Sequence, residues 1–127
     1  MGTFEQVKDM AMALGLTPEN EDPAGELFTV TDEERGINNL VIDCEEPILV
    51  LEQVVAPAGA NTDFQKLLKM NRHMIHGAFA LSDDGTMIIW RDTLQLANLD
   101  LNELEGSLNA LSMTLAENAD DLVEMSK

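Results

Sequence analysis

Two histidines three positions apart are the residues whose spacing best suits metal chemistry. His73 and His76 lie at the expected end of a helix, where this spacing can direct two imidazoles at one ion. A tetrahedral zinc site needs three or four protein ligands, and no further histidine or cysteine follows at zinc spacing. We therefore expect surface or interface histidines with no bound metal or cofactor. A small metal-dependent enzyme that uses these histidines and nearby carboxylates is kept as an alternative hypothesis.

The other reactive side chains form no catalytic pattern. Cys44 is the only cysteine, and no histidine with an asparagine or aspartate accompanies it as in a nucleophilic site, so we interpret it as a small strand residue. Acidic pairs such as Glu33-Glu34 are too common in this chain to nominate a general acid and base. Asp83-Asp84-Gly85 lacks the later ligands of a calcium loop. The sequence therefore predicts a binding protein and no enzyme.

Composition limits the class of partner. The chain has 127 residues, 45% of them hydrophobic, which predicts one domain spanning residues 1–127 with a single core. Its net charge of −17 repels phosphate backbones and anionic lipids, so we expect neither nucleic acid nor a membrane as a partner. No signal peptide and no run of about 18 apolar residues is recognisable. Together with the single cysteine, this predicts a cytoplasmic protein.

Apolar spacing predicts eight elements in the order α-β-β-β-α-β-β-α. The expected helices cover residues 3–14, residues 64 to 74 or 75, and a leucine-striped segment that begins near Asp100. The expected strands cover residues 26–31, 37–44 and 48–55, followed by a hairpin at residues 77–93 that turns at Asp84-Gly85. The segment 17–25 is interpreted as a surface connection. This order predicts an α+β sandwich with a mostly antiparallel five-stranded sheet.

Two further patterns bear on binding. Residues 87–90 are apolar at four consecutive positions, which predicts a strand that buries both faces. The eight methionines can fill a core or line an adaptable peptide groove. Those on or beside the predicted helices and hairpin, for which both roles stay open, are Met10, Met12, Met70, Met74 and Met87.

A set of short motifs gives a family resemblance. They are Leu67-Leu68-x-Met70-Asn71, the glycine-started run 77–81, Asp84-Gly85, Leu94, and Leu99-Asp100-x-x-x-Leu104. In this order, and with this length and acidity, the chain resembles class I type III secretion chaperones of the Tir-chaperone-like superfamily. The resemblance implies a homodimer that binds an extended segment near the N-terminus of a secreted client and keeps it competent for export. A regulatory module of the same fold that binds a folded cytosolic partner is the alternative.

The resemblance also implies two groups of site residues. The client grooves would lie beside the first helix and on the adjacent sheet, and their candidates are Phe4, Val7, Ala11, Leu14, Phe28, Val30, Leu49 and Leu51. Burial of each in the core stays open as the alternative role. The dimer would use the second helix and the hairpin, and its candidates are Met74, Ile75, Phe79, Ile89 and Trp90. The apolar run at residues 87–90 independently suits such an interface.

Overall fold

The computed structural model describes residues 3–127, which form three α-helices, six strands and one short 3-10 helix. In chain order these are α1 (Thr3–Ala13), β1 (Glu19–Asp22), β2 (Leu27–Asp32), η1 (Glu33–Arg35), β3 (Ile37–Glu45), β4 (Ile48–Pro57), α2 (Phe64–Asn71), β5 (Ala78–Leu81), β6 (Met87–Gln95) and α3 (Leu101–Met125). All eight predicted elements form. Helix α2 is shorter than its apolar spacing predicts, because the Asn71 side chain bonds to the backbone of Phe79 and the chain turns there.

The six strands form one antiparallel sheet in the order β1-β2-β3-β4-β6-β5. The α+β fold class is confirmed, but the prediction of five strands is wrong by one. The additional strand is β1, which lies inside the segment that we interpreted as a surface connection. It pairs with β2 at Glu19↔Thr29 and Asp22↔Leu27. Its sequence, Glu-Asn-Glu-Asp, contains no apolar residue, so no alternation could reveal it.

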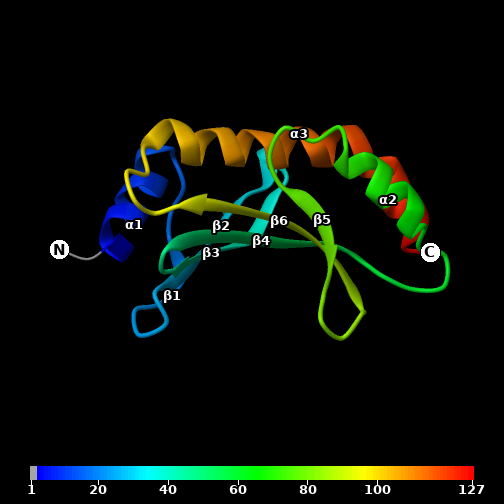
Figure 1. Cartoon of the computed structure of the whole chain (residues 1–127), viewed down its shortest axis with the longest axis horizontal. Helices are drawn as coiled ribbons and strands as arrows, with labels where there is room; N and C mark the ends of the chain where they lie inside the picture. The colour runs from blue at the N-terminus through cyan, green and yellow to red at the C-terminus, as the bar shows by residue number, and fades with distance from the viewer. Residues whose placement is uncertain (1–2) are drawn as a thin grey trace.

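All three helices pack on one face of the sheet. Figure 1 shows α3 running along the sheet with α1 at one end and α2 at the other. The larger core cluster joins α1, α3 and the helix-facing side chains of β2, β3, β4 and β6. A second cluster lies beneath α2 and the C-terminal end of α3, where Leu67, Phe79, Ile88, Leu122 and Met125 meet. The fold therefore has two layers, and no helix among residues 3–127 covers the opposite face, which we call the open face.

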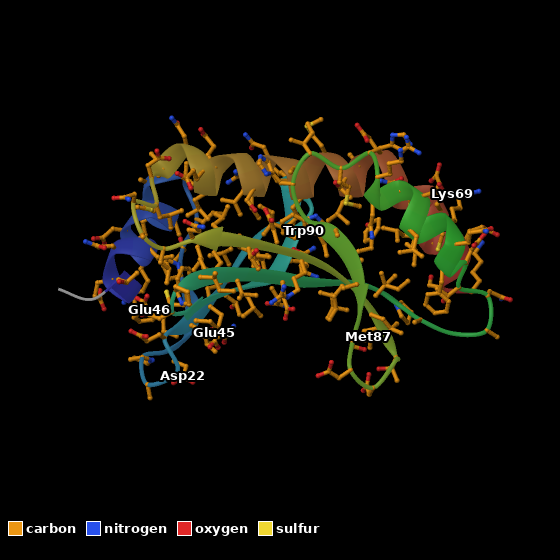
Figure 2. All side chains as sticks on the ribbon, viewed as in Figure 1. Asp22, Glu45, Glu46, Lys69, Met87 and Trp90 are labelled. Carbon is orange, nitrogen blue, oxygen red and sulfur yellow. The ribbon has the colours of Figure 1, made fainter. Side chains whose placement is uncertain are left out.

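The open face explains why residues 87–90 do not bury both sides within one chain. Ile88 and Trp90 are buried, and Figure 2 shows Trp90 on the side of β6 that faces the helices. Met87 is exposed and Ile89 is only half-buried. Within one chain, helices cover only the face of β6 that carries Ile88 and Trp90, and burial of the second face stays a prediction.

Polar side chains fix where α2 and α3 begin. Asp63 accepts a hydrogen bond from the Lys66 backbone N–H at 3.0 Å, and Asp100 accepts one from Glu103 at the same distance. Such N-caps satisfy backbone donors that the first helical turn leaves without partners. Both helix starts agree with those predicted from the sequence.

Candidate protein-binding surfaces

The residues predicted to line the client groove meet inside the molecule. Seven of them are buried and belong to one core cluster, and Leu14 is half-buried and packs against it. Phe4 and Phe28 illustrate this arrangement, since their rings contact edge to face at 6.1 Å between centroids. The structure therefore brings these side chains together on the helix-covered face of the sheet. A client can contact them only by displacing core neighbours.

An exposed apolar face lies instead on α2 and β5. The side chain of Leu68 is 70% exposed, and those of Phe64 and Leu81 are also exposed. They border a groove of about 280 Å³, which is lined by Phe64, Leu67, Leu68, Asn71, Phe79, Ala80, Leu81 and Ile88. Exposed large apolar side chains that gather at one place are typical of protein contacts. Sequence reasoning did not identify Leu68 as a surface residue, because Leu67 and Leu68 both belong to the predicted apolar stripe. Only Leu67 is buried.

Asn71 attaches α2 to β5. Its side-chain Oδ1 accepts a hydrogen bond from the Phe79 N–H at 2.7 Å, and its Nδ2 donates to the Phe79 carbonyl at 3.2 Å. The amide thereby takes the place of a neighbouring strand at the outer edge of β5. This pair of hydrogen bonds gives a physical reason for the Leu-Leu-x-x-Asn motif, since Leu67 anchors α2 in the core while Asn71 fixes the strand.

The five predicted dimer residues are divided between the surface and the core. Ile75 is 77% exposed and follows α2, and Met74 beside it is half-buried against both core clusters. Phe79 lines the groove from beneath but is itself buried. Ile89 is half-buried on the open face, and Trp90 is fully buried in the core. The structure therefore presents Ile75 for contact and keeps Trp90 out of reach.

Acidic side chains collect on the open face. Asp43 lies on β3 between Leu27 and Val50, its Cα partners on the adjacent strands. Its Oδ1 atom is inaccessible to solvent and makes no hydrogen bond among the described residues. Desolvation raises the pKa of the Asp43 carboxyl to about 6, and the neighbouring Glu45 and Glu52 carboxylates add to this rise. A basic partner on this face is Arg91, which pairs with Glu52 at 2.9 Å.

The raised pKa of Asp43 predicts a pH-dependent stability. An aspartate that holds its proton more tightly in the folded state destabilises that state as the pH rises from about 4 to about 6. We expect Asp43→Asn to raise the free energy of unfolding at pH 8 by about 1 to 2 kcal/mol, since partial solvent access reduces the effect. At pH 4 the two proteins should have equal stability. Urea unfolding at both pH values measures the difference.

A matched control separates this local effect from net charge. Asp9 is exposed on α1, so Asp9→Asn removes the same charge from a solvated position. Equal stabilisation by Asp9→Asn and Asp43→Asn at pH 8 would show that general charge repulsion, not the site of Asp43, is responsible.

The histidines and the cysteine lie apart from any metal-ligand cluster in the described part of the chain. Within residues 3–127, no three or more histidine, cysteine, aspartate or glutamate side chains come together in a way that could hold a metal ion. His73 and His76 are both exposed. Burial raises the pKa of the Cys44 thiol to about 11, so this side chain is an unreactive core residue at neutral pH. None of the described helices is both long and apolar enough to cross a membrane.

Comparison with known structures gives the same fold. The chain superposes on the structure of the HopA1–SchA chaperone–effector complex with a TM-score of 0.66, at 14% identity over 89% of this chain and 91% of that chain. It superposes on the Yersinia pestis type III secretion chaperone SycH, solved with a fragment of YscM2, with a TM-score of 0.52, at 17% identity over 98% and 100%. It superposes on YbjN of E. coli, a proposed transcription regulator, with a TM-score of 0.73, at 12% identity over 93% and 92%.

These likenesses establish a type III secretion chaperone-like fold. No curated protein sequence matches the chain. A protein-family model, however, matches it from residue 1 to residue 127. The resemblance predicted from the short motifs is thereby confirmed, and the chain belongs to the CesT_Tir_1 family.

Proposed function

We propose that this protein is a cytoplasmic, non-enzymatic chaperone that binds an extended N-terminal segment of a secreted client and keeps it competent for export. The observation that carries this proposal is the fold, which is shared with SchA in a chaperone–effector complex and with SycH bound to a fragment of its partner. The exposed apolar face on α2 and β5 and the strongly acidic surface also suit a soluble protein that holds others. No catalytic step is required for this function.

Affinity capture from the native cell lysate, followed by native mass spectrometry, tests the proposal. We expect two copies of this chain with one secreted protein, which is protected from proteolysis only over a short segment near its N-terminus. A homodimer that retains no secreted protein, or that retains a folded cytosolic one, would contradict the chaperone function.

The proposed dimer would form through the apolar face of α2 and β5. Leu68 is the most exposed leucine of α2, and a carboxylate at its place would have to be buried without a counter-ion. We expect Leu68→Asp to raise the dimer dissociation constant about 100-fold, which is a typical loss at the centre of an interface. Sedimentation equilibrium over a range of protein concentrations measures this constant.

Gln65 provides the matched control for that substitution. It is exposed on the same helix, so Gln65→Asp adds the same charge outside the apolar groove. The α2–β5 interface would be refuted by a Leu68→Asp protein that dimerises as tightly as the Gln65→Asp protein.

The likeness to YbjN favours one alternative, a regulatory module that binds a folded cytosolic partner. Such a partner would contact preformed surface and would not need to unfold. The capture experiment distinguishes the two functions, because a regulatory partner stays folded and resists proteolysis along its whole length.

A further inference from the structure

The sheet ends in two strands of four residues, and these two strands are held in different ways. At one edge, β5 buries Phe79 in the core and receives two hydrogen bonds from Asn71. At the other edge, all four side chains of β1 are exposed. The ladder between β1 and β2 is also irregular between its two paired positions. Thus β5 is anchored by apolar burial, whereas β1 has only polar contacts.

The side-chain contacts of β1 are exposed and replaceable. Asn20 donates to the Thr29 hydroxyl at 2.9 Å, and Lys8 on α1 pairs with Glu21 at 2.8 Å. The Lys8 side chain is 15% exposed and that of Glu21 is 41% exposed, so solvent still screens this ion pair in part and its contribution to stability is modest. Lys8 also contacts Glu5 at 3.1 Å, so it keeps a counter-ion if Glu21 moves away. The loss of β1 would therefore leave no buried charge without a partner.

Backbone conformation also weakens the attachment of β1. Glu26, which follows the strand, has a φ angle of 56°, in the left-handed region that is unfavourable for glutamate. Asn20 within the strand has a φ angle of 49°, which asparagine tolerates but which departs from extended strand geometry. None of the core residues belongs to β1.

We propose that the outer edge of β2 is where the client strand pairs, and that β1 is the chain's own placeholder, which the client displaces. This inference rests on the proposed chaperone function. The incoming segment is extended and pairs with the backbone of β2 after β1 leaves. It places an acidic or other hydrogen-bond-accepting side chain beside Lys8, where Glu21 lies in the free protein. The opposite edge of the sheet, β5, cannot pair with a client strand at Phe79, because the N–H and C=O of Phe79 are both hydrogen-bonded to the Asn71 side chain.

A reversible disulfide across β1 and β2 tests the displacement. Glu19 and Thr29 lie directly opposite each other on the two strands, so Glu19→Cys with Thr29→Cys joins these strands when oxidised. Cys44 does not interfere, because its thiol is buried. We expect the oxidised protein to bind at least tenfold less of the secreted protein recovered by affinity capture than the same protein after reduction. The control is Ile48→Cys with Gln95→Cys, which joins β4 to β6 and should bind equally in both states.

Hydrogen exchange of the free wild-type protein tests the attachment of β1 without any client. We expect the amides of β1 that bond to β2 to exchange at least tenfold faster than those of β5 that bond to β6. If the β1 amides exchanged as slowly as the β5 amides, the inference would be overturned.

The two hypotheses fail in different ways. If the oxidised and reduced proteins bind equal amounts of client, the client pairs elsewhere, so the inference fails while the chaperone function stands. If wild type and both reduced variants recover no secreted protein, the chaperone function fails, and the assignment of the β2 edge fails with it.

Discussion

Val7→Asp is expected to unfold the protein, because the side chain of Val7 is only 1% exposed and packs between α1 and the sheet. A carboxylate at this position would lose its hydration and gain no partner. The expected loss is about 4 kcal/mol or more, a large part of the roughly 5 to 15 kcal/mol that stabilises a typical domain. Circular dichroism in increasing urea measures the loss. The result bears directly on the predicted client groove, to which Val7 belongs.

Met12 on the same helix is the control for Val7→Asp. Its side chain is 52% exposed, so Met12→Asp should change the stability by no more than about 0.5 kcal/mol. A Val7→Asp protein that melts like the Met12→Asp protein but no longer binds client would show that Val7 lines a groove and is not required by the core.

Gly77→Ala is expected to lower the free energy of unfolding by about 3 kcal/mol. Gly77 has a φ angle of +77°, and a Cβ atom built on it would lie 2.6 Å from two ring carbons of Trp90. The left-handed conformation costs an alanine about 1 to 2 kcal/mol, and overpacking against the buried indole adds about 1 to 3 kcal/mol. Because Trp90 is the only tryptophan, its fluorescence follows urea unfolding directly at this site.

Gly85 separates the two contributions to that loss. Its φ angle is +76°, but a Cβ atom added there would meet no other atom within 4 Å. Gly85→Ala should therefore cost only about 1 to 2 kcal/mol, the cost of the backbone conformation alone. Equal losses for Gly77→Ala and Gly85→Ala would mean that the Trp90 indole moves aside freely.

The elements that sequence could predict are those that bury apolar residues. The leucines of α3 recur at helical spacing because one side of this helix lies on the sheet, and Leu104, Leu108 and Leu111 are almost fully buried there. Asp84-Gly85 marks the turn between β5 and β6 because Gly85 takes a positive φ angle. Strand β1 was missed because its four polar residues form a strand only where the edge of β2 is available.

The spacing of apolar residues along the sequence does not show which of them are buried in the fold. Leu67 and Leu68 are adjacent leucines in one predicted helix, yet the first is buried and the second is largely exposed. The difference depends on how α2 rotates against β5, which Asn71 fixes through Phe79. Trp90 was assigned to the dimer interface for a related reason. Its place on the core side of β6 follows from pairing with β4, which involves residues about 40 positions earlier in the chain.

The two hydrogen bonds between the Asn71 side chain and the Phe79 backbone protect the edge of β5 from pairing with strands of other molecules. Under the proposed chaperone function, the protein would meet unfolded chains that can stack into cross-β fibrils on any free strand edge. At β5 the amide of Asn71 occupies the groups of Phe79 that would template such stacking. An interface made by side chains of α2 and β5 can then close as a two-fold dimer, whereas backbone pairing at this edge could add strands without limit. Asn71 thus protects the β5 edge from acting as a seed for fibrils, whichever chains the protein binds.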